Sequence, residues 1–142
     1  MQSTETNKAA FRRLVEEGPN RGNLDVVTEV LTEDVVFHPA GESDPVTGRD
    51  GVRALIQGAR TAFPDLRADI DQLVGEGDRV IGVVTLRGTN TGDAMGQPAT
   101  GRSATFTVVH MLRFVDGRIA EDRQVMDRLS LMEQLQPSPQ PA

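Results

Sequence analysis

Residues 105–127 read TFTVVHMLRFVDGRIAEDRQVMD, and this stretch decides the fold. Polar and apolar side chains alternate along both halves, which is the pattern of a β-strand with one buried face. Asp116 and Gly117 interrupt the alternation, and the Asp-Gly dipeptide favours a two-residue hairpin turn. The stretch therefore predicts two antiparallel strands, about residues 103–114 and 118–128, joined at this dipeptide.

The segments upstream of this hairpin supply two more strands and a set of helices. Alternation predicts strands over 66–74 and 79–88. Helical spacing of apolar residues predicts helices over 6–17, 24–31 and 50–62, with a short strand over 35–38 and a last helix over 129–135. The sequence thus predicts the α+β class, in which a curved antiparallel sheet wraps around helices to form a cone-shaped α+β barrel with an internal pocket.

Length and charge limit the classes of function. The 142 residues suit a single domain, expected over 1–135, followed by a Pro-rich tail over 136–142 that is expected to be disordered. With 15 Lys and Arg against 21 Asp and Glu, the net charge of −6 disfavours nucleic acid and anionic membrane surfaces as partners. The N-terminal residues lack the order of a signal peptide, and the longest apolar stretch, 80–86, is too short to span a bilayer. A cytoplasmic protein is predicted.

In a regular hairpin about Asp116-Gly117, each step away from the turn on one strand is matched by one step on the other. His110 would then face Arg123, and Phe106 would face Asp127. This register gives one face the apolar residues Phe106, Val108, Leu112, Phe114, Ile119 and Val125. The same face also receives the polar residues His110, Glu121, Arg123 and Asp127. The opposite face, which includes Asp122 and Gln124, is expected to contact solvent or another subunit.

Charged groups on an apolar face must be paired or must face a cavity, because unpaired buried charge is costly. The pattern therefore predicts a pocket for a small organic molecule, with Asp127 as a catalytic carboxylate deep inside it and His110 as a second catalytic residue. Arg123 and His38 are candidate substrate-binding residues, and the expected apolar wall is Phe106, Val108, Leu112 and Val125. Asp127 lies four positions, or roughly 13 Å, from the expected level of His110, so direct contact between the two is not expected.

Each candidate also has a purely structural interpretation. Asp127 precedes the last helix and is a possible N-cap or partner of Arg128. Arg123 is a possible partner of Glu121 on the same strand. His110 is compatible with a hydrogen-bonded core histidine, and His38 with a surface position.

The motifs of several common site types do not occur. The sequence has two His, no Cys and no His pair at ligand spacing, so no metal site is predicted. It has no Gly-rich phosphate loop before a helix and no G-x-S-x-G motif, so no cofactor is predicted.

A set of ordered motifs resembles the SnoaL-like polyketide (ester) cyclases of the nuclear-transport-factor-2-like superfamily, from the first helix to Leu135. The matching segments are residues 63–66, 75–80, 88–92, 96–102, 113–119, 121–127 and 134–135. The resemblance implies a cone-shaped fold, a homodimer through the outer sheet face, and a cofactor-free intramolecular aldol condensation. It implies that Asp127 is the acid/base residue. Arg123 stands where many members carry Trp.

The resulting functional hypothesis is acid/base catalysis of cyclisation or isomerisation of a polyketide-like carbonyl compound. Burial makes a carboxylate more basic, and hydrogen-bond donors stabilise an enolate. The alternatives are epoxide opening, hydration or dehydration in the same pocket, and a non-catalytic protein that binds small molecules. The Gly-rich segment 88–102 is interpreted either as a lid over the substrate or as a plain loop.

Overall fold

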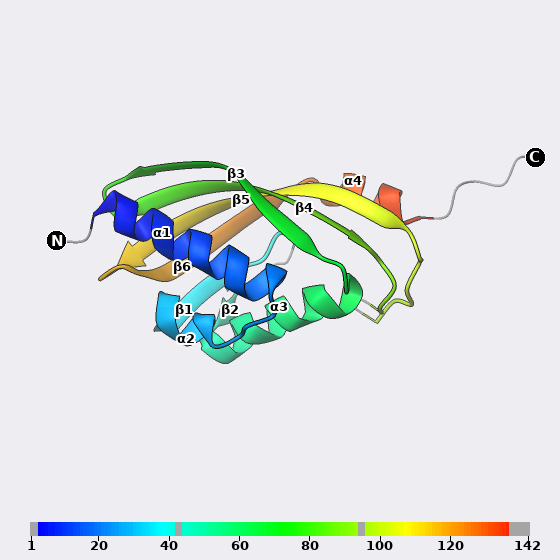
Figure 1. Ribbon diagram of the computed structural model, residues 1–142, viewed down its shortest axis with the longest axis horizontal. Coiled ribbons are helices and arrows are strands. Elements are labelled where there is room, and N and C mark those ends of the chain that lie inside the picture. The colour runs from blue at the N-terminus through cyan, green and yellow to red at the C-terminus, as the bar shows by residue number, and fades with distance from the viewer. Residues whose placement is uncertain (1–2, 42–43, 94–95, 137–142) are drawn as a thin grey trace, which may run out of the picture.

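A curved sheet of six strands, in the order β2-β1-β6-β5-β4-β3, forms one layer of the protein (Figure 1). The computed structural model describes residues 3–41, 44–93 and 96–136. The strands are β1 (Leu31–His38), β2 (Val46–Thr47), β3 (Arg67–Glu76), β4 (Arg79–Thr89), β5 (Ser103–Val115) and β6 (Arg118–Met126). All neighbouring strands are antiparallel except β1 and β6, which run parallel.

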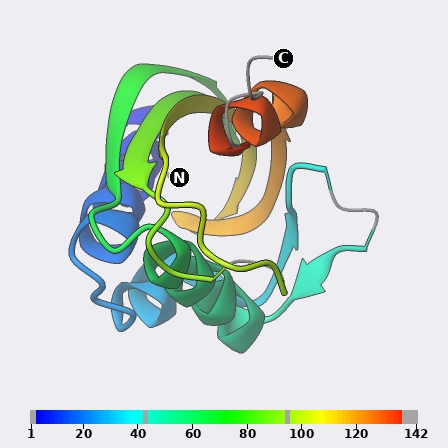
Figure 2. The same ribbon diagram turned by 90° about the vertical axis from the view of Figure 1, so that its right-hand side faces the viewer.

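Three helices cover the concave face of this sheet, as the end view in Figure 2 shows. They are α1 (Thr4–Val15), α2 (Val26–Val30) and α3 (Arg49–Ala62), and a π-helical turn η1 (Glu16–Asn20) follows α1. The fourth helix, α4 (Arg128–Leu135), lies at the end of the sheet that is far from the first turn of α1 (Figure 1). No helix in the described ranges is both long and apolar enough to cross a membrane.

The main core lies between the concave face and the helices. Phe11 of α1 and the α2 valines Val26 and Val27 are fully buried there against Leu112 of β5 and Ile119 of β6. A smaller cluster around Phe63 and Ala104 packs at the other end, where Leu131 and Leu135 of α4 cover it. Burial of these side chains holds the helices against the concave face of the sheet, because each large buried side chain contributes about 1.5–3 kcal/mol to the stability of the fold.

The predicted α+β class with a curved sheet on helices is confirmed, and the four long strands lie close to their expected positions. Three features differ. Strand β1 begins at Leu31 rather than at Val35, a short strand β2 lies where no strand was predicted, and β1 pairs parallel with β6. The expected tail lies outside the described residues except for Gln136, and the assignment of 1–135 as one domain stays a prediction.

Two β-bulges change which side chains reach the concave face. In β6, Phe114 pairs with Ile119 while Arg113 pairs with Glu121, so Ala120 is an extra residue. In β3, Ile70 pairs with Val84 and Gln72 with Val83, so Asp71 is extra. A bulge reverses the side-chain alternation of every residue beyond it. The sequence alternation alone does not reveal either bulge.

The Gly-rich segment after β4 is held against the end of α3. Asn90 is buried, and its side-chain amide donates to the backbone oxygens of Ala62 at 3.0 Å and Gly92 at 2.8 Å. Its side-chain oxygen accepts from the backbone N–H of Thr100 at 3.0 Å. The two ends of this segment are therefore fixed to the body of the protein. Whether the part between them closes over a substrate stays a prediction.

Substitution of Gly92 by Ala is expected to destabilise the protein by about 1–3 kcal/mol, because the loop that contains residue 92 would have to move away from the end of α3. A Cβ at this position would lie 1.7 Å from the backbone oxygen of Thr61. The control is Gly58→Ala in α3, where a Cβ meets nothing within 4 Å and where the substitution should stabilise the helix by roughly 0.5–1 kcal/mol. Urea unfolding of both variants tests the difference, and equal midpoints would contradict the observed docking.

Candidate active site

The bulge at Ala120 places Asp122, rather than Glu121, on the concave face of the sheet. Beyond it, Asp122 pairs with Leu112, Gln124 with His110, and Met126 with Val108. The regular register predicted from the sequence is therefore correct only next to the turn and is wrong from Arg113 onward. The expected pairs of His110 with Arg123 and of Phe106 with Asp127 do not form, and Asp122 and Gln124 lie on the inner face.

Asp122, His110 and Gln124 form a hydrogen-bonded cluster on this face. The Nδ1 atom of His110 lies 2.8 Å from Oδ2 of Asp122, and Nε2 of Gln124 donates to the same oxygen at 3.1 Å. Asp122 is completely buried, whereas 15% of the His110 side chain is exposed. Among the described residues, Nε2 of His110 has no hydrogen-bond partner.

The second carboxylate oxygen of Asp122 makes this cluster unusual. Oδ1 is buried and accepts no hydrogen bond from the described part of the chain. An unsatisfied buried polar atom costs about 1–3 kcal/mol, and Oδ1 of Asn7 and Oγ1 of Thr32 are the other buried side-chain atoms without a partner in the described part of the chain. A buried acidic group that holds a partly exposed imidazole in one orientation is an arrangement suited to proton transfer.

The structure corrects the expected position of Asp127. Its side chain is exposed and caps α4, where Oδ1 accepts from the backbone N–H of Ser130 at 2.9 Å. Because β6 ends at Met126, Asp127 does not face Phe106 across the sheet. The N-cap interpretation describes its observed contact, and a catalytic role for it stays an untested prediction.

The other predicted site residues divide between the two faces of the sheet. Phe106, Val108 and Leu112 lie on the concave face as expected, with Phe106 partly exposed and the other two buried. Arg123 is exposed, and Val125 is 54% exposed and pairs with Val109 on the convex face. The expectation that Arg123 and Val125 face a common pocket with His110 is wrong, because the bulge turns both outward.

His38 also lies away from the cluster. Its Nε2 atom is 2.9 Å from Oε2 of Glu121, and Arg113 lies 3.5 Å from the other carboxylate oxygen. The hydrogen bond from His38 lowers the pKa of Glu121 below the usual 4.5, and Arg113 adds to this against the opposing effect of burial. These side chains connect β1, β5 and β6, and Glu121 is bonded to His38 rather than to Arg123.

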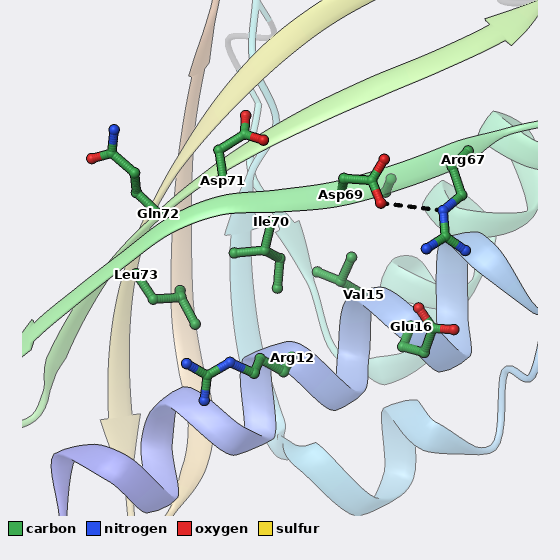
Figure 3. Close-up of a pocket in the computed structure, with 10 residues that line it drawn as sticks. Arg12, Val15, Glu16, Arg67, Asp69, Ile70, Asp71, Gln72 and Leu73 are labelled. Atoms are coloured by element: carbon green, nitrogen blue, oxygen red, sulfur yellow. Dashed lines mark hydrogen bonds and ion pairs between the residues drawn. The ribbon is translucent and has the colours of Figure 1, made fainter.

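Two hollows lie against the sheet, at different places. One, of about 440 Å³, lies between α1 and β3, where Ile70 and Leu73 project toward α1 while Asp71 and Gln72 project away (Figure 3). The other, of about 370 Å³, lies where β6 gives way to α4. It is lined mainly by residues of the convex face, Thr105, Thr107, Val109 and Val125, together with Phe106, Met126, Asp127 and Ser130. None of the three residues of the polar cluster lines either of these hollows.

A metal centre receives no support from side-chain positions in the described ranges, because no three His, Asp or Glu side chains are grouped to hold an ion. The groups of the cluster are one imidazole, one buried carboxylate and one amide. Together they can accept, hold and return a proton.

Comparison with known proteins identifies the family of the chain. Residues 9–135 match the model of the SnoaL-like polyketide cyclase family. The chain belongs to that family. The resemblance found in the sequence is thereby confirmed, and so is the prediction of a polyketide cyclase-type enzyme at the level of the family.

Individual relatives show how far the similarity extends. The aklanonic acid methyl ester cyclase DnrD of Streptomyces peucetius is 32% identical over 134 residues, which cover 92% of this chain and 91% of that enzyme. A structure assigned as a SnoaL-like polyketide cyclase from Jannaschia sp. CCS1 is 25% identical, with a TM-score of 0.88 over 98% of this chain and 99% of that one. AclR of Streptomyces galilaeus, assigned as a hydroxylase, is 30% identical, with a TM-score of 0.81 over 98% of this chain and 87% of its own.

Sequence reasoning missed Asp122 and Gln124 because it placed them on the outer face. One signal was present: the regular register put three charged residues and a histidine among apolar side chains, which is an improbable inner face. Allowing one extra residue after Ile119 removes Glu121, Arg123 and Asp127 from that face together.

The Glu121 contacts predict a pH-dependent stability. Because its pKa is lowered in the folded state, the stabilisation is present above the unfolded pKa near 4.5 and is lost as the pH falls through the folded value. Glu121→Gln should lower the free energy of unfolding at pH 7 by less than about 1 kcal/mol, since the pair is partly exposed, and by less at pH 3. Urea unfolding at both pH values measures this, with Glu133→Gln as control; an equal loss at both would contradict the prediction.

Proposed function

We propose that this SnoaL-like protein catalyses a cofactor-free, intramolecular aldol-type cyclisation of a polyketide ester related to aklanonic acid methyl ester. The observation that carries the proposal is the partly exposed His110 whose Nδ1 contacts the fully buried Asp122. The identity to DnrD over 92% of the chain supports the substrate class. The cluster supplies a proton acceptor and donor, which is the chemistry that an aldol reaction requires.

Accessibility decides the roles within the pair. Both oxygens of Asp122 are buried, and one of them is already bonded to His110 and Gln124, so a substrate carbon meets the imidazole first. His110 is therefore the general base and acid, acting through Nε2. Asp122 fixes the tautomer that leaves Nε2 unprotonated and stabilises the imidazolium when it forms.

The reaction balances without any added redox reagent. Nε2 of His110 removes a proton from a carbon flanked by carbonyl groups, and the electron pair of that C–H bond moves into the enolate. The enolate carbon attacks a second carbonyl carbon of the same molecule, forming the C–C bond and an alkoxide. The imidazolium of His110 returns its proton to the alkoxide, so the product is an isomer of the substrate.

Apolar side chains near the pair favour this chemistry. Val108 and Leu112 flank His110 on β5 and are buried, and the partly exposed Phe106 lies on the same face. An apolar wall with a few polar groups suits an aromatic polyketide and keeps water away from the enolate.

Three substitutions test the assignment. His110→Gln and Asp122→Asn should each reduce kcat for ring closure of aklanonic acid methyl ester by about 100-fold or more, because each disables the proton relay. Asp127→Asn should stay within about twofold, because Asn also serves as an N-cap. Product formation is followed by chromatography with mass detection, and melting curves verify folding. Retained activity in Asp122→Asn with loss in Asp127→Asn would instead support Asp127 as the acid/base residue.

The same assay separates the alternatives. Cyclisation leaves the mass of the substrate unchanged, whereas hydration or epoxide opening adds one water and dehydration removes one. Thermal stabilisation by the ester without any product would indicate a non-catalytic binding protein.

We also propose that the protein is a homodimer through the convex face of its sheet. Pairing in the sheet places Ile81, Val83, Val109, Met111 and Val125 on this face, and all are at least partly exposed. A contiguous apolar face of this kind favours association with a second copy.

Val125→Asp is expected to convert the dimer to a monomer, because it would bury a charge in the interface. Light scattering after size-exclusion chromatography measures the mass. The control is Leu129→Asp on α4, outside the sheet, where the side chain is also exposed and the substitution should leave the dimer intact. A monomeric parent protein would contradict the proposal.

A further inference from the structure

A ring contact links α1 to the polar cluster. The ring of Phe11, which is fully buried, lies 5.1 Å from that of His110, centroid to centroid, with 57° between the two ring planes. Tilted aromatic pairs at this separation attract each other by about 0.5–1.5 kcal/mol beyond the burial of their area. Phe11 therefore acts directly on the orientation of the imidazole.

Gly82 makes this contact possible. It pairs directly with His110 across β4 and β5, so a side chain at this position would stand beside the imidazole on the concave face. A Cβ there would lie 2.7 Å from Cε2 of Phe11 and 3.2 Å from Cδ2 of Leu73. The ring of Phe11 thus occupies the space that a side chain at 82 would need, and glycine inside a strand marks such a close approach.

The bulge in β3 contributes the third member of this contact. Because Asp71 is the extra residue, Leu73 pairs with Gly82 and projects toward α1 (Figure 3). Leu73, Gly82, His110 and Gln124 consequently form one row across β3, β4, β5 and β6. Phe11 is confined in this row between Leu73 and the imidazole.

We propose that Phe11, seated over Gly82, is a positioning residue for His110. It restricts rotation of the imidazole about the Cβ–Cγ bond, so that Nδ1 stays toward Asp122 and Nε2 stays available to the substrate. The hydrogen bond to Asp122 selects which edge of the ring faces the carboxylate, and the contact with Phe11 holds the ring in the plane that keeps this bond aligned. The catalytic consequence rests on the proposed function, whereas the effect on the ring is a property of the free protein.

Nitrogen NMR of the imidazoles tests the effect on the ring without any substrate. The chain has only two His, so His110→Gln assigns both sets of signals. In the parent protein Nδ1 of His110 should carry the proton in the neutral form. In Phe11→Leu, a measurable fraction of the molecules should carry the His110 proton on Nε2 instead, or the two tautomers should exchange with each other.

Two further variants keep the test decisive. Gly82→Ala leaves Phe11 in the sequence but displaces its ring, and it should change the His110 signals in the same direction. Phe114→Leu is the matched control, because Phe114 is also a buried phenylalanine but lies four residues from His110 on β5. The control should lose stability comparably and leave the His110 tautomer unchanged.

The kinetic readout separates this proposal from the proposed function. Phe11→Leu should lower kcat about tenfold with little change in KM, because a misoriented base affects the chemical step. An unchanged tautomer in both Phe11→Leu and Gly82→Ala would overturn the positioning role. A changed tautomer with unchanged kcat would support positioning and would count instead against His110 as the acid/base residue.

Discussion

A carboxylate buried on the concave face of a sheet must find hydrogen-bond donors, and this requirement governs the candidate site. Asp122 is completely buried, and its donors are His110 on the neighbouring strand and Gln124 two positions along its own. A slip of one residue between β5 and β6 would turn Asp122 outward and bring Glu121 into the core. The cost of burying an unpaired charge therefore specifies the register that also assembles the polar cluster.

The two bulges explain how ordinary strands produce this arrangement. Ala120 changes the face of every later residue in β6, and Asp71 does the same in β3. The first brings Asp122 and Gln124 inward, and the second brings Leu73 to the Phe11 ring above Gly82. The candidate site is thus built by two added residues rather than by an irregular loop, which leaves its side chains on a rigid support.

The fold by itself does not select a reaction. DnrD is named a cyclase and AclR is assigned as a hydroxylase, and both are similar to nearly the whole of this chain. What distinguishes one member from another is the set of polar groups on the concave face and the apolar wall around them. In this protein the polar set is an imidazole, an amide and a carboxylate with one unpaired oxygen.

The sequence by itself determined the class of the fold, the long strands and helices, the family, and the inner position of His110, because hydrophobic period and turn residues are local properties. It did not determine which acidic residue accompanies that histidine. A single extra residue at Ala120 leaves the composition of β6 unchanged but reverses the side on which Asp122, Arg123 and Asp127 lie. Only the tertiary structure decided this, because the face of a strand depends on its pairing with β5 and β1 and on what the core can bury. The contact of Phe11 with His110 is likewise tertiary, since it joins residues far apart in the chain through the side chain that Gly82 lacks.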